Sequence, residues 1–222
     1  MTPSQFLRPS LTHRVIKSGF LSPGLLAATA FLLSGFLPLQ AQVNSEFQIT
    51  KIDPSLPTTP QITFNGTDKS VPGGAKKWLS VEVTFTWKPR MATDKFSDDL
   101  VFNYYVLLAN KSQTAPQGTL LSGQVTHTAV PANTSDLKSV MYVSPRAMER
   151  FFAGKIPSSS DSAVTDIGVT ITRQGQIVAQ KSLKGSGIWW PQFQQTSGFL
   201  LDKDSTPFAP LFWDYYEPVK KP

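Results

Sequence analysis

The sequence predicts an all-β protein in which two antiparallel sheets pack as a sandwich. Three observations lead to this fold class. Apolar and polar residues alternate along short segments, turn-forming residues separate these segments, and no strand–helix–strand alternation typical of parallel sheets is present. We expect about eight strands, one short helix and an extended aromatic segment at the C-terminal end.

The clearest strand signal lies between residues 78 and 88. Five apolar side chains alternate there with polar ones: Leu79, Val81, Val83, Phe85 and Trp87. Because side chains on a strand point alternately to its two faces, we expect the apolar set to face the core. Glu82 and Thr84 then lie on the opposite face, where we expect substitutions to be tolerated.

Seven further segments have the composition of strands: 47–52, 61–64, 100–109, 119–130, 137–143, 167–173 and 176–183. Segment 100–109 is apolar on both faces, which is typical of a central strand. Gln174 and Gly175 separate the last two segments and predict a hairpin turn.

A short helix is predicted after segment 137–143. Ser144 is a suitable N-cap, Pro145 fits the first helical position, and Gly154 ends the helix shortly after Phe152. We expect residues 155–162 to form a polar loop.

Residues 1–41 resemble an export signal, because basic residues precede an uncharged apolar run from residue 19 to residue 39. Ala41 is the small residue expected before a cleavage site, so the mature chain should begin near Gln42. An uncleaved membrane anchor is the alternative, since about 20 apolar residues can span a bilayer. The expected organisation is a signal peptide (1–41), a sandwich (42–188) and a C-terminal aromatic segment (189–222).

Composition excludes several classes of function. The chain contains no cysteine, which excludes disulfides, iron–sulfur clusters, thiolate nucleophiles and cysteine-based zinc sites. Its formal net charge is +6, and three of the positive charges, Arg8, Arg14 and Lys17, belong to the signal segment. The remaining charge is too small for a nucleic-acid footprint, so no nucleic-acid partner is expected.

No catalytic signature is recognisable. His127 is the one histidine outside the signal segment, and we interpret it as an ordinary strand residue. Ser135 and Lys138 match a Ser-x-x-Lys pattern, but the companion motifs of serine enzymes of that kind are absent. The acidic pairs at 98–99 and 202–204 lack the spacing of a calcium loop. We therefore expect no enzymatic activity, no cofactor and no metal.

The C-terminal segment is unusually aromatic. Nine rings lie between residues 189 and 216, and three prolines interrupt any long element there. The favoured interpretation is that these rings cover the β core. The alternative is an exposed binding surface, for which the candidate residues are Trp189, Trp190, Trp213, Tyr215 and Tyr216.

The order of a basic leader, a cysteine-free β body and the segment from Thr206 to Tyr216, TPFAPLFWDYY, resembles a family of exported pilus-like proteins of verrucomicrobial bacteria. These proteins are encoded beside type IV pilus assembly components. The resemblance implies an immunoglobulin-like fold. Gly24 stands where a prepilin leader has glutamate, so the resemblance implies an accessory role and not a fibre subunit.

The expected function is that of a non-enzymatic envelope protein of a Gram-negative-type bacterium, in the outer membrane, the periplasm or at the cell surface. Its expected partners are envelope or pilus-assembly proteins, through which it would associate with a membrane. A carbohydrate-binding module that stacks sugars on Trp189, Trp190 and Trp213 is the alternative. In that case glycans are the partners.

Overall fold

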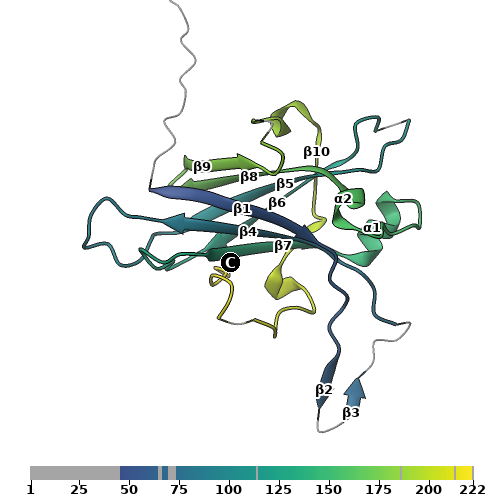
Figure 1. The fold of residues 1–222 in the computed structure, drawn as a ribbon, viewed down its shortest axis with the longest axis horizontal. Helices are drawn as coiled ribbons and strands as arrows, with labels where there is room; N and C mark the ends of the chain where they lie inside the picture. The colour runs from purple at the N-terminus through teal and green to yellow at the C-terminus, as the bar shows by residue number, and fades with distance from the viewer. Residues whose placement is uncertain are drawn as a thin grey trace, which may run out of the picture. The chain divides into compact units, whose positions relative to one another are not determined.

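A computed structural model of the protein describes residues 46–64, 67–69, 74–113, 115–185, 187–212 and 214–221 (Figure 1). The predicted signal peptide, 1–41, and the candidate binding residue Trp213 lie outside these residues. Among the described residues, no helix is long and apolar enough to cross a membrane.

The described strands form two main sheets, one above the other in Figure 1. The first sheet has the order β1-β4-β7-β11, with bounds Phe47–Ser55, Leu79–Trp87, Leu137–Val143 and Leu200–Asp202. The second has the order β10-β6-β5-β8-β9, with bounds Gln195–Ser197, Leu120–His127, Leu100–Leu108, Val164–Arg173 and Gln176–Ser182. Strands β2 (Ile62–Phe64) and β3 (Thr67–Lys69) form a separate hairpin.

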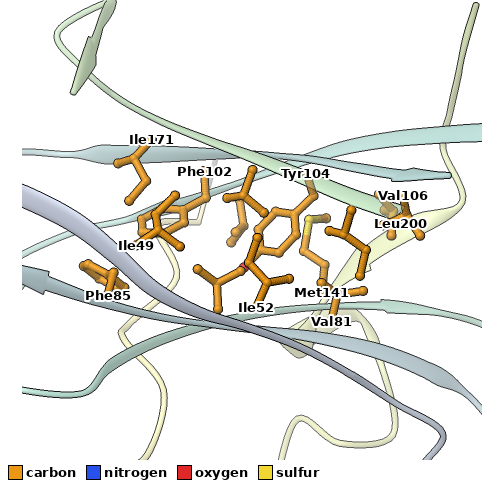
Figure 2. Close-up of a cluster of buried hydrophobic side chains, with 14 of the residues drawn as sticks. Ile49, Ile52, Val81, Phe85, Phe102, Tyr104, Val106, Met141, Ile171 and Leu200 are labelled. Atoms are coloured by element: carbon orange, nitrogen blue, oxygen red, sulfur yellow. The ribbon is translucent and has the colours of Figure 1, made fainter. Parts of the chain in front are cut away.

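The core lies between the inner faces of the two sheets, and Figure 2 shows side chains from both. Phe85 of β4 and Phe102 of β5 meet edge to face, with ring centroids 4.8 Å apart. Val81 of β4 and Tyr104 of β5 are fully buried in the same cluster. The predicted all-β sandwich is therefore confirmed, and its arrangement is compatible with an immunoglobulin-like fold.

Local signals located the elements well. Strands β4, β5 and β7 lie within or match the predicted segments, and Gln174 and Gly175 have φ angles of 50° and 77°, as a tight hairpin turn requires. Helix α1 spans Pro145–Phe151, and Ser144 Oγ accepts a hydrogen bond from the N–H of Ala147 at 3.3 Å.

The predicted polar loop at 155–162 is wrong in its second half. Helix α2 spans Ser160–Ala163, and strand β8 begins directly after it at Val164. A capping box explains the helix, because Ser159 and Ser162 exchange hydrogen bonds between side chain and backbone. The serines of this stretch are therefore a capping signal and not a loop signal.

The C-terminal segment contributes to both sheets. It contains two short 3-10 helices, η1 (Trp190–Gln192) and η2 (Lys203–Ser205), and the strands β10 and β11. β10 pairs in parallel with β6, whereas β11 pairs antiparallel with β7. Leu200 of β11 packs against Gly123 of β6, where a Cβ atom would lie 2.6 Å from the Cβ of Leu200.

Residues after Tyr216 also bond to β6 and β7, near the ends of these two strands that lie away from β10 and β11. The N–H of Glu217 donates to the carbonyl of Lys138 on β7 at 2.9 Å. The N–H of Lys220 donates to the carbonyl of Thr126 on β6 at 2.8 Å, and Thr128 donates to Pro218 at 3.3 Å. Residues 217–220, called the C-terminal strap below, therefore link β6 to β7.

Candidate functional site

Trp190, a predicted binding residue, lies against the outer face of the five-stranded sheet. It is 5% exposed and stacks on Tyr105 with ring centroids 5.3 Å apart. Gly168 of β8 makes room for it, because a Cβ atom there would lie 2.1 Å from the indole ring. An exposed sugar-stacking role for Trp190 does not fit this burial.

Trp189 is partly buried beside it. Its ring meets Trp190 and Phe193 edge to face, with centroids 5.8 Å and 5.5 Å away. Leu107 and Leu120 complete this second apolar cluster. The two tryptophans therefore cover the sheet at this position.

A third apolar cluster covers the outer face of the four-stranded sheet. Phe208 stacks on Tyr142 of β7 with ring centroids 4.7 Å apart, and its ring meets Trp78 edge to face. Leu211 and Tyr216 pack against the same cluster. Rings of the C-terminal segment thus lie on the outer faces of both sheets.

Tyr215 and Tyr216, the remaining predicted binding residues, contact an ion pair on this face. The hydroxyl of Tyr216 donates to Glu82 Oε2 at 3.0 Å. Lys138 Nζ lies 3.0 Å from Glu82 Oε1 and 5.1 Å from the ring centroid of Tyr215. Glu82 is therefore not open to solvent, because Tyr216 and Lys138 bond to it. Thr84 is 6% exposed and accepts a hydrogen bond from Lys138 Nζ at 3.1 Å. That both positions tolerate substitution stays a prediction, which these contacts argue against.

Electrostatics keep this cluster in one protonation state. Burial, and then the charge of nearby Glu82 and Tyr142, raises the pKa of Tyr216 far above its usual value. Burial likewise raises the pKa of Tyr142 to about 12. Burial lowers the pKa of Lys138, but its hydrogen bond to Glu82 and the charge there outweigh burial, so the net change is upward. At neutral pH both tyrosines remain hydrogen-bond donors and Lys138 remains a cation.

Phe212 is the most exposed of the segment's rings that the structure describes. It is 62% exposed, and its ring centroid lies 6.2 Å from that of Tyr215, which is 48% exposed. The φ angle of Phe212 is 56°, a left-handed conformation that is uncommon for a bulky side chain. We call Phe212 and Tyr215 the exposed aromatic pair.

A buried polar network lies between the sheets. The hydroxyl of Tyr104 donates to Ser139 Oγ at 2.7 Å, and Ser139 Oγ lies 2.7 Å from His127 Nε2. On the other side of the ring, His127 Nδ1 lies 3.0 Å from the carbonyl oxygen of Glu217. A neutral imidazole satisfies both contacts if Nδ1 donates and Nε2 accepts.

The pair of Ser139 and His127 has the spacing of a nucleophile and a base, but both side chains are buried, and of the two it is His127 that lines the cavity beside the strap. Ser139 is 0% and His127 1% exposed. Burial lowers the pKa of His127 to about 4, while hydrogen bonds to the carbonyls of Pro218 and Glu217 act in the opposite direction. His127 is thus a neutral structural residue that connects β6 to the C-terminal strap. Strand patterning could not reveal this network, since Ser139 looks like any polar strand residue.

A cavity of about 450 Å³ lies beside the strap. Its lining includes Lys203, whose Nζ donates to the carbonyl of Ala209 at 2.8 Å. Burial lowers the pKa of Lys203, and the charge of Asp204 partly offsets this. Within the described part of the chain, no group of three histidine or carboxylate side chains is arranged to hold a metal ion.

The comparisons with known proteins concern fold and family. No curated protein matches the chain. A crystal structure of a protein from the verrucomicrobial bacterium Akkermansia muciniphila is similar with a TM-score of 0.62 and 22% identity, over 83% of this chain and 100% of that chain. At this identity the likeness shows a common fold. A family model that names no activity matches residues 38–222, and the chain belongs to that family.

Proposed function

We propose that this chain is an exported, non-enzymatic protein of the bacterial cell envelope, accessory to pilus assembly, that acts by binding another protein. The contact surface includes the exposed aromatic pair. The structural match to a verrucomicrobial protein supports the kind of organism implied by the sequence resemblance. The outer membrane, the periplasm and the cell surface are the proposed locations.

The main support for this proposal is that Phe212 is exposed and has a left-handed backbone conformation. Aromatic side chains are enriched at the centre of protein interfaces, where they contribute most of the binding energy. A left-handed conformation for a bulky residue costs of order 1–3 kcal/mol and persists where the surroundings impose it. Most other rings of the segment are packed on the sheets, so the outward direction of Phe212 is not required by the core.

A non-enzymatic role is supported by the burial of Ser139 and His127. A hydrolase needs its nucleophile within reach of the substrate and next to a pocket that positions the reacting group. Here the serine hydroxyl is held between Tyr104 and His127 inside the sandwich.

The alternative of a module that stacks sugars on tryptophans has less support. Trp190 is covered by the sheet on one side and contacts Trp189 on another. Trp213 lies outside the described residues. A binding role for these tryptophans would require the segment around Trp190 to detach from Tyr105.

Site-specific photo-crosslinking in cells tests the proposal. A photoreactive phenylalanine analogue replaces Phe212, and the same analogue at Phe96 serves as the control. The two phenylalanines are similarly exposed, at 62% and 65%, but Phe96 lies in the loop between β4 and β5. We expect position 212 to yield one dominant cross-link to an envelope or pilus-assembly protein that position 96 does not yield. Identical products at both positions, or none at 212, would contradict the proposal.

A further inference from the structure

The outer face of the five-stranded sheet carries a row of uncharged polar side chains. The strand register aligns Gln124 of β6 with Asn103 of β5, then with Thr170 of β8 and Gln180 of β9. The neighbours of Asn103 in sequence, Phe102 and Tyr104, are buried in the core, so Asn103 lies on the outer face. Amide or hydroxyl groups of four adjacent strands thus lie in one line, in which Gln124, Asn103 and Gln180 are at least partly exposed and Thr170 is buried.

A cavity of about 400 Å³ lies over one end of this row. Apart from two glycines and Leu200, its lining consists of hydrogen-bonding side chains: Asn103, Tyr105, Ser122, Gln124, Gln195 and Ser197. None of the described residues that line it is charged. The cavity therefore offers many donors and acceptors but no fixed charge.

One wall of the cavity is aromatic. Trp190 stacks on Tyr105 with an interplanar angle of 11°, so one face of the Tyr105 ring is covered. The rest of the ring is half-buried and lines the cavity. Trp190 thus acts as a support that fixes the orientation of Tyr105.

The amides of this cavity have no evident structural role. Asparagine is unfavourable in strands, and β5 is the central strand of its sheet. The side chains of Asn103, Gln124 and Gln195 make no hydrogen bond to another described residue. Residues whose type is unfavourable for the secondary structure around them, and which make no compensating contact, are frequently functional.

We propose that this cavity binds a neutral sugar unit of an oligosaccharide. A sugar carries closely spaced hydroxyls, each both donor and acceptor, and the amide and hydroxyl side chains of the lining match this chemistry. Its C–H face packs on an aromatic ring, a role that Tyr105 fills. None of the described lining residues is a cation that could pair with a phosphate, sulfate or uronate. Anionic ligands are therefore disfavoured, because burying an unpaired charge is costly.

This inference does not depend on the proposed protein contact. The exposed aromatic pair belongs to the segment that covers the four-stranded sheet, whereas the cavity lies on β5, β6 and β10 of the other sheet. It also differs from sugar stacking on tryptophan, since Trp190 lies behind the ring that would meet the sugar.

Isothermal titration calorimetry on the purified full chain tests the proposal. The probes are cellohexaose, laminarihexaose, mannohexaose and xylohexaose at millimolar concentration, with hexagalacturonate as the anionic comparison. We expect at least one neutral probe to bind and the anionic one not to bind. Asn103→Ala and Gln124→Ala should each weaken binding roughly two- to tenfold, the effect of one net hydrogen bond.

Gln176→Ala is the matched control, because Gln176 is an exposed amide on the same sheet that does not line the cavity. It should bind like the wild type. Thermal melts establish that each variant is folded, and Gln124, whose side chain is exposed, gives a variant that leaves the core untouched. The proposal is overturned if no neutral probe binds the wild type, if hexagalacturonate binds more tightly, or if Gln124→Ala binds unchanged.

Discussion

Acidification below about pH 6.5 should destabilise this protein through His127. The imidazole is buried between the sheets, Nε2 faces Ser139, and Nδ1 faces the carbonyl of Glu217. Protonation would turn Nε2 from an acceptor into a donor and place a charge on a side chain that is 1% exposed. The folded state therefore resists binding this proton.

The magnitude follows from the two pKa values. The pKa of His127 is about 4 in the folded protein, whereas that of an unperturbed histidine side chain is 6.5. Because the folded pKa is the lower one, stability is complete above pH 6.5 and is lost as the pH falls toward 4. Linkage gives a loss of about 2 kcal/mol at pH 5 and about 3 kcal/mol at pH 4.

Other titrating groups near the strap change how steeply the stability falls with pH, but they do not reverse the fall. Burial raises the pKa of Glu217, which therefore favours the folded state as the pH falls and partly offsets the effect of His127. The hydrogen bond from Lys220 lowers the pKa of Asp99, whose contribution is lost at still lower pH. Lys203 and Lys221 line the cavity beside the strap as well.

Urea unfolding at pH 7, 6, 5 and 4 measures the effect, with His127→Gln as the comparison. The wild type should lose stability over this range. The variant should start lower, because it disturbs the contacts to Ser139 and Glu217, but should change less between pH 7 and pH 5. A wild-type stability that is the same at pH 7 and pH 5, or an equally steep loss in the variant, would refute the role assigned to His127.

Three further predictions concern the C-terminal segment and processing. Gly168→Ala should cost about 1–3 kcal/mol in urea unfolding, because the new methyl group would displace Trp190. Truncation after Tyr216 should cost about 2–4 kcal/mol in the same assay, since three backbone hydrogen bonds between the strap and strands β6 and β7 are lost. N-terminal sequencing of the exported protein should find a start within a few residues of Gln42; retention of the apolar run at 19–39 would contradict cleavage.

Much of the sandwich was predictable because the longer strands each carry their own signal. Alternation identified β4 from the spacing of Val81, Val83 and Phe85, and these residues are fully buried in the core. The cap at Ser144 and the turn at Gln174 and Gly175 are equally local, so they needed no knowledge of the tertiary fold.

Contacts between distant parts of the chain were not predictable in this way. Strand β10 is three polar residues long, and its parallel pairing with β6 leaves no pattern in the sequence. Glu82 has the alternation of a solvent-facing residue, but Tyr216, far along the chain, covers it. The row of uncharged polar side chains on the second sheet appears only when β5, β6 and β8 are aligned in register.

The most direct test of the central claim measures how tightly this protein binds the partner that cross-links to position 212. We compare the wild-type chain with Phe212→Ser and with the control Phe96→Ser, using purified partner and calorimetry. An interface hot spot loses about 2 kcal/mol or more on truncation, so Phe212→Ser should bind roughly thirtyfold more weakly while Phe96→Ser binds normally. Equal affinity of the wild type and Phe212→Ser would contradict the proposal that the exposed aromatic pair is the contact surface.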